Sequence, residues 1–99
     1  MEIKIQSIHF DATEKLEAFI EKKVAKLEKT FEDVKKVEVQ CKVVKPATAQ
    51  NKQVSLTVTV PGTTLFTEKT SDTFEESCDL CVDSMRVQLQ KFKEKLRNH

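Results

Sequence analysis

The chain has 99 residues, the size of one typical domain, so we expect a single domain spanning residues 1–99. Charged residues make up 33% of it and hydrophobic residues 38%, a balance that excludes a disordered chain. Seventeen Lys and Arg oppose sixteen Asp and Glu, so the net charge is only +1. Any binding to nucleic acid must therefore come from the distribution of the charges, not from their sum.

Composition also limits the kind of binding site and the compartment. The chain has no Trp or Tyr, so aromatic platforms that stack nucleobases are not expected. Residues 1–30 contain no apolar stretch long enough for a signal peptide or a membrane span, which predicts a soluble, cytoplasmic protein without a membrane partner. The three cysteines are expected to be reduced thiols, because their number is odd and no export signal is present.

Hydropathy patterning predicts a strand and then a helix in the first third of the chain. Residues 2–9 alternate, with Ile3 and Ile5 on one face, as in a strand. Asp11, followed three residues later by Glu14, predicts a capping box that opens a helix over residues 12–29. The apolar stripe of this helix consists of Leu16, Phe19, Ile20, Val24 and Leu27.

The remainder of the chain predicts three strands and a long helix. Alternation predicts strands at 34–44, 54–60 and 64–70, the last being weaker because the adjacent Leu65 and Phe66 cannot both face inward. A polar loop over 45–51 and a turn at Pro61-Gly62 separate these strands. Thr73 with Glu76 forms a second capping box, which opens a helix running to about residue 97. Its apolar stripe consists of Phe74, Cys78, Cys81, Val82, Met85, Leu89, Phe92 and Leu96.

These elements predict an α+β fold in the order β-α-β-β-β-α, with a four-stranded mixed sheet and two parallel helices packed on one face. Each strand is polar on one face, so one side of the sheet should stay open. The first two strands are joined by a helix and should be parallel, whereas the last three should form a meander. In this topology the C-terminal ends of both helices lie at the same end of the domain.

Basic residues gather towards those helix ends. The first helix sorts its charges around its circumference into a basic and an acidic flank, which the helix macrodipole does not explain. The last helix is acidic in its first half and basic in its second, an arrangement that the macrodipole alone would favour. A cationic cluster without aromatic platforms suits a phosphate backbone better than base edges, so we expect it to bind structured RNA. The predicted RNA-binding residues are Lys22, Lys23, Lys26, Lys29, Arg86, Lys91, Lys93, Lys95 and Arg97.

The sequence offers little support for catalysis or metal binding. Cys78 and Cys81 have a C-x-x-C spacing, but zinc would need two more ligands, and Cys41, His9 and His99 have no paired spacing. Acidic neighbours inside a helix disfavour a thiolate, so we interpret the cysteines as core residues. No triad spacing and no Gly-rich phosphate loop is present. We therefore expect no enzyme activity, no metal, no cofactor and no small-molecule substrate.

Three stretches resemble the ribosome hibernation-promoting factor family, whose relatives include the ribosome-associated inhibitor and the sigma-54 modulation proteins. They read KVAKLE over 23–28, CDLCVD over 78–83 and QLQKFKEK over 88–95. The resemblance covers the whole chain. It implies the same fold, and RNA-binding roles for Lys23, Lys26, Lys91, Lys93 and Lys95.

The resemblance further implies a function on the ribosome. A member of this family would bind the small ribosomal subunit and its ribosomal RNA in the decoding region, across the path of messenger RNA and tRNA. Translation would thereby be blocked during starvation. The chain stops at His99, directly after the last helix, so it resembles the short form without a second domain. We expect it to be a monomer when free.

Two alternatives from other classes remain open. The acidic half of the last helix and the open sheet face could form a protein-interaction module that modulates a transcription factor of the sigma-54 type. A small redox protein using Cys78 and Cys81 is the third hypothesis, and it predicts rapid thiol labelling of the folded protein.

Overall fold

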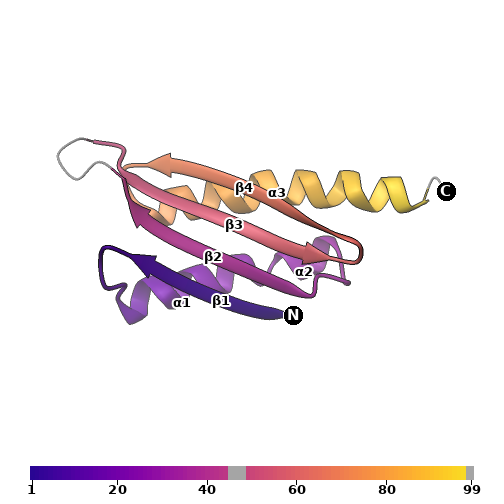
Figure 1. Ribbon diagram of the computed structural model, residues 1–99, viewed down its shortest axis with the longest axis horizontal. Coiled ribbons are helices and arrows are strands. Elements are labelled where there is room, and N and C mark those ends of the chain that lie inside the picture. Colours follow the sequence, from indigo (N-terminus) through magenta and orange to yellow (C-terminus); the bar gives the residue numbers. More distant parts are fainter. Residues whose placement is uncertain (45–48, 98–99) are drawn as a thin grey trace.

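The computed structural model of the protein describes residues 1–44 and 49–97 (Figure 1). The predicted loop over 45–51 thus lies partly outside the described residues, at 45–48. The elements are β1 (Glu2–Ile8), α1 (Glu14–Val24), α2 (Leu27–Thr30), β2 (Lys36–Val43), β3 (Lys52–Val60), β4 (Thr63–Ser71) and α3 (Phe74–Arg97). The predicted element order is confirmed, with the first helix divided into α1 and α2.

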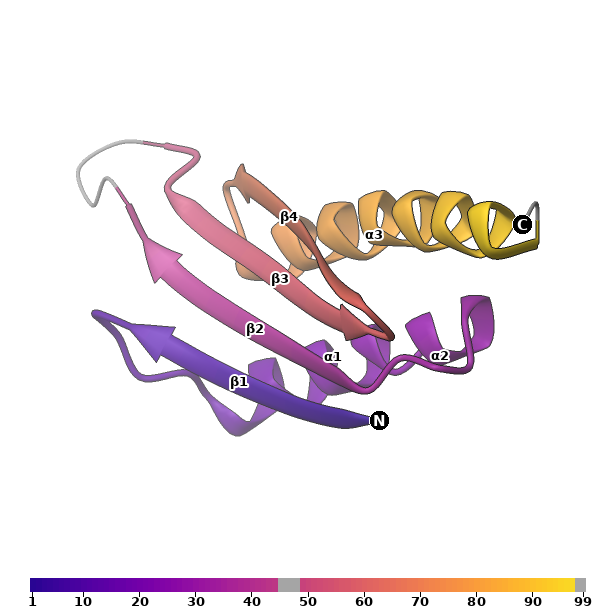
Figure 2. The same ribbon diagram turned by 45° about the vertical axis from the view of Figure 1, so that its right-hand side comes forward.

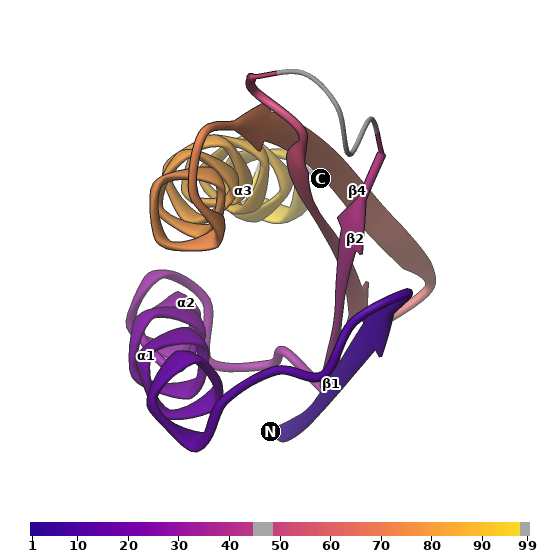
Figure 3. The same ribbon diagram turned by 90° about the vertical axis from the view of Figure 1, so that its left-hand side faces the viewer.

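The strands form one mixed sheet in the order β1-β2-β3-β4. β1 pairs with β2 in parallel, whereas β2, β3 and β4 form an antiparallel meander. Figure 3 shows α1, α2 and α3 on the same side of the sheet, so the other face is open. In Figure 2, α1 with α2 and α3 run in the same direction and end at the same end of the molecule. The predicted α+β fold with parallel helices on one face is therefore confirmed.

The core lies between the sheet and the helices, at the positions that the alternation indicates. Its fully buried members come from both layers: Ile20, Val24 and Leu27 from the first helical segments, Val37, Cys41, Val54, Leu56 and Val58 from the central strands, and Cys78, Cys81, Met85 and Leu89 from α3. Each fully buried aliphatic side chain contributes about 1.5–3 kcal/mol to folding. In β4, Leu65 is half-buried and Phe66 is 56% exposed, which resolves their adjacency as predicted.

The predicted cap at Asp11 is wrong, and α1 begins two residues later than expected. Thr13 is the N-cap, because its backbone is extended and its Oγ1 accepts a hydrogen bond from the backbone N–H of Leu16 at 3.1 Å. The ring of Phe10 stacks on the ring of Phe74, with centroids 4.6 Å apart. This contact anchors the segment before α1 on α3, and the extended backbone at Thr13 is where the chain turns into the helix.

The predicted continuous helix over residues 12–29 is also wrong. After Val24 the backbone tightens: the N–H of Lys26 donates to the carbonyl of Lys23, and the N–H of Lys29 donates to the carbonyl of Lys26. These three-residue spacings belong to a 3₁₀-type turn rather than an α-helix. The chain keeps its direction, and Leu27 remains fully buried at the start of α2.

α3 matches its prediction at its start but not at its last turn. Thr73 Oγ1 accepts a hydrogen bond from the backbone N–H of Glu76 at 3.0 Å, as an N-cap does. At the other end, the ring of Phe92 meets Phe31 edge-on, with centroids 5.5 Å apart. Leu96, predicted to belong to the buried stripe, is 52% exposed, because α3 extends beyond the sheet (Figure 1).

Candidate nucleic-acid interface

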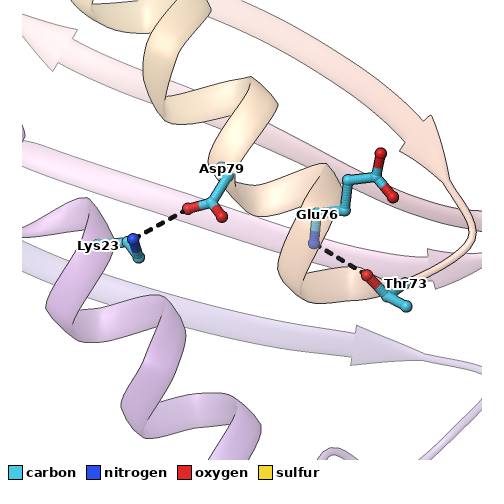
Figure 4. Close-up of polar contacts among 4 residues, drawn as sticks. All are labelled: Lys23, Thr73, Glu76 and Asp79. Atoms are coloured by element: carbon cyan, nitrogen blue, oxygen red, sulfur yellow. Dashed lines mark hydrogen bonds and ion pairs between the residues drawn. The ribbon is translucent and has the colours of Figure 1, made fainter.

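A lysine near the C-terminal end of α1 contacts α3. Lys23 Nζ lies 3.3 Å from a carboxylate oxygen of Asp79 (Figure 4). It also lies 5.4 Å from the centroid of the Phe19 ring. Lys23 is one of the predicted RNA-binding residues, and the structure gives its charge a partner within the protein. The charge of Lys23 is therefore balanced within the α1–α3 contact, and it is less available to an external anion than the charge of a lysine without such a pair.

Two hollows lie side by side between α2 and α3 and share Thr30 in their linings. Together they are called the groove. The first, of about 330 Å³, is lined by Thr30, Asp83, Arg86, Val87 and Gln90. The second, of about 300 Å³, is lined by Lys29, Thr30, Phe31, Glu32, Asp33 and Lys93. The groove thus brings together cations that are far apart in the sequence.

Lys29, Arg86 and Lys93 are the groove cations. Lys29 and Arg86 are exposed, whereas Lys93 is half-buried. None of the three forms an ion pair with any described residue, in contrast to Lys23. Their charges are consequently available to an external anion.

Carboxylates share the groove with these cations. Asp83 lines the first hollow beside Arg86, and Glu32 and Asp33 line the second beside Lys29. Glu32 and Asp33 were not predicted as site residues, because they follow the first helix and so have no place on a helical wheel. Their position at the C-terminal end of that helix was the signal that could have found them.

The three alternate lysines near the end of α3 do not form one surface. Ser84 Oγ accepts a hydrogen bond from Thr67 Oγ1 at 3.0 Å, and Gln88 Nε2 donates to the carbonyl of Phe66 at 2.8 Å, so this flank of α3 lies against β4. Lys91 and Lys95 follow Gln88 by three and seven residues and share its flank.

Lys93 lines the groove on the opposite flank of α3. Arg97, four residues further on, shares the flank of Lys93, whereas Lys22 and Lys26 are exposed on and just after α1. The predicted cations are thus spread along the molecule, from Lys23 beside Asp79 near the start of α3 to Arg97 at its end, and they lie on two sides of α3.

The cysteines lie in the core and are poor nucleophiles. Cys41, Cys78 and Cys81 are fully buried free thiols. Burial raises the pKa of Cys41 to about 11 and the pKa values of Cys78 and Cys81 to about 12. Cys81 Sγ also donates to the carbonyl of Val54 at 3.0 Å. This environment favours protonated core thiols over a redox pair.

The described residues provide neither a metal site nor a membrane-spanning helix. Over 1–44 and 49–97, no group of His, Cys, Asp and Glu side chains is arranged to hold a metal ion. No helix in the described part of the chain is both long and apolar enough to cross a membrane.

The fold and the groove define a class of α+β domains that present a parallel helix pair on one face of a four-stranded sheet. Residues 3–97 match the family described as "Sigma 54 modulation protein / S30EA ribosomal protein", and the chain belongs to this family. It is similar to the ribosome hibernation promoting factor of Pseudomonas putida, with 27% identity over 95 residues that cover 96% of this chain and 89% of the relative.

Solved structures share the fold. The structure of a ribosomal subunit interface protein from Coxiella burnetii has a TM-score of 0.85 at 22% identity, covering 95% of this chain and 99% of that one. The N-terminal domain of Thermus thermophilus Protein Y has a TM-score of 0.79 at 22% identity, covering 93% of this chain and 99% of that domain. The β-α-β-β-β-α architecture described above is therefore a known one.

Proposed function

We propose that this protein binds the small ribosomal subunit through ribosomal RNA in the decoding region, and thereby silences translation during starvation. Membership of the family supports a ribosomal role, as does the similarity to a ribosome hibernation promoting factor. The observation that carries the proposal is the convergence of Lys29, Arg86 and Lys93 on one groove, where none of them forms an ion pair with a described residue. This partner places the protein in the cytoplasm.

The proposed mechanism is occlusion rather than catalysis. Phosphate oxygens of folded RNA bind the groove cations and release condensed counterions, which supplies a salt-sensitive affinity. Phosphate contacts fix the position and orientation of a protein without reading bases, in keeping with a chain that has no Trp or Tyr. Once held there, the folded domain occupies the space that messenger RNA and tRNA need.

Lys91 and Lys95 extend the proposed interface to the other flank of α3. Because Gln88 and Ser84 hold this flank against β4, the two lysines lie outside the groove. In the proposal they contact RNA phosphates that the groove cations do not reach. Lys22, Lys26 and Arg97 continue the interface at its exposed margins.

Co-sedimentation with isolated small ribosomal subunits tests the proposal. The variant Lys29→Glu/Lys93→Glu reverses both cations of the second hollow and should abolish co-sedimentation at physiological salt. Lys15→Glu, compared with Lys29→Glu and Lys93→Glu as single variants, is the matched control, because Lys15 is exposed in the first turn of α1, at the opposite end of the molecule. Circular dichroism should show all variants folded. Unchanged co-sedimentation of the double variant would remove the groove from the proposal.

A second candidate function, modulation of a protein partner, is favoured by the open sheet face. A hollow of about 430 Å³ on the sheet is lined by residues including Gln6, Gln40 and the exposed Phe66. A protein partner bound there would be retained at high salt and lost in Phe66→Ser. RNA binding through the groove predicts instead that binding is lost at high salt and retained in Phe66→Ser.

A further inference from the structure

The carboxylates of the groove have no evident role in stabilising the fold. Asp83, Glu32 and Asp33 are exposed, and none of their side chains forms an ion pair or a hydrogen bond with a described residue. Asp83 is the tenth residue of α3, well beyond the first turn where an acid complements the helix dipole. These acids therefore differ from Asp79, which pairs with Lys23.

Their positions oppose the binding of a polyanion. Each hollow of the groove combines an unpaired cation with an unpaired carboxylate, Arg86 with Asp83 and Lys29 with Glu32 and Asp33. A phosphate seated on a groove cation is attracted by it and repelled by the neighbouring acid. An RNA whose phosphates can shift along the groove meets both charges, and the net attraction is small.

We propose that Asp83, Glu32 and Asp33 are specificity-determining residues that restrict the groove to folded RNA of fixed phosphate spacing. A rigid RNA can hold its phosphates at Lys29, Arg86 and Lys93 and keep them away from the acids. A flexible single strand does not hold such a spacing, and in this proposal the regular spacing of an arbitrary duplex does not match the positions of the three cations, so both are repelled by the acids. The inference rests on the proposed function and adds the feature by which the groove distinguishes its partner from bulk cellular RNA.

The variant Asp83→Asn tests the inference, because it removes one groove carboxylate and leaves the side-chain shape. Its dissociation constants are measured for isolated small ribosomal subunits and for a short RNA duplex of arbitrary sequence. Binding to the duplex should strengthen about threefold at low salt, with a salt slope steeper by up to about 0.9. Affinity for the subunits should change less, so that the ratio of the two affinities falls.

Glu21→Gln is the matched control, with the same change of net charge on an exposed residue of the acidic flank of α1. It should leave the ratio unchanged. An unchanged ratio in Asp83→Asn, or an equal change in Glu21→Gln, would overturn the inference while leaving subunit binding intact. If the native protein does not bind subunits, the proposed function fails, and the duplex measurements still decide whether Asp83 limits binding to arbitrary RNA.

Discussion

Replacing Lys93 by Gln should remove one phosphate contact from the groove. The salt dependence of binding measures how much that contact contributes to the affinity. If each of the groove cations Lys29, Arg86 and Lys93 neutralises one phosphate, together they contribute a slope of about −2.7 to log K against log salt. Between 50 and 200 mM salt this weakens binding about 40-fold. With Lys93→Gln the contribution is about −1.8, and the loss is about 12-fold.

Small-subunit binding is measured by fluorescence anisotropy of a labelled protein across this salt range. Because other cations add equally to both proteins, the quantity to compare is the difference in slope, about 0.9. Lys15→Gln, the same change at the far end of α1, should keep the native slope. Identical slopes for Lys93→Gln and the native protein, or an equal reduction in Lys15→Gln, would refute the role assigned to the groove.

Three further predictions concern the scaffold. A double-mutant cycle with Lys23→Met and Asp79→Asn should give a coupling of only about 0.2–1 kcal/mol in urea unfolding, because the two side chains are 30% and 48% exposed; a stronger coupling would contradict a solvated pair. Thr73→Ala should cost about 0.5–2 kcal/mol through loss of the α3 cap, and an unchanged urea midpoint would contradict that cap. The thiols of Cys78 and Cys81 should react with Ellman's reagent only as fast as the protein unfolds. Since burial raises their pKa values from 9.0 to about 12, the unfolded chain loses these protons first, so the free energy of unfolding should fall as pH rises from 9 towards 12; rising stability there would refute the assignment.

Local patterning predicted the fold because each strand repeats its polarity every two residues. Val54, Leu56 and Val58 alternate with polar residues, and all three are fully buried in β3. The ends of the helices were harder to predict from the sequence. Asp11 and Thr13 are both good capping residues, so the local sequence does not choose between them, and the hydrogen bond from Leu16 to Thr13 Oγ1 identifies the cap.

The sequence of the turn between α1 and α2 contains no residue that predicts a break in the helix. Ala25 and Lys26 are good helix formers, and no Gly or Pro lies nearby. Leu96 continued the apolar stripe in sequence, but burial depends on where the sheet ends, and α3 continues beyond it.

The site was predicted in part for similar reasons. The cationic residues were apparent from composition, and the parallel course of the helices followed from topology. Which of these cations share a surface could be learned only from the side-chain contacts in the structure. Gln88 and Ser84 orient α3 against β4, and only then does Lys93 lie on the groove with Lys91 and Lys95 on the other flank. Side-chain pairing, as between Lys23 and Asp79, had no signal in the sequence.

The separation of charge along α3 has a consequence for encounter as well as for binding. Acids such as Asp79 and Asp83 occupy its first half, and Arg86, Lys93 and Arg97 its second, in a molecule 49 Å long with a net charge of only +1. Such a particle is pulled only weakly as a whole by a negatively charged surface, but it carries a dipole moment that experiences a torque. At low ionic strength it should rotate during approach so that the C-terminal tip of α3 arrives first, and added salt should slow productive collisions.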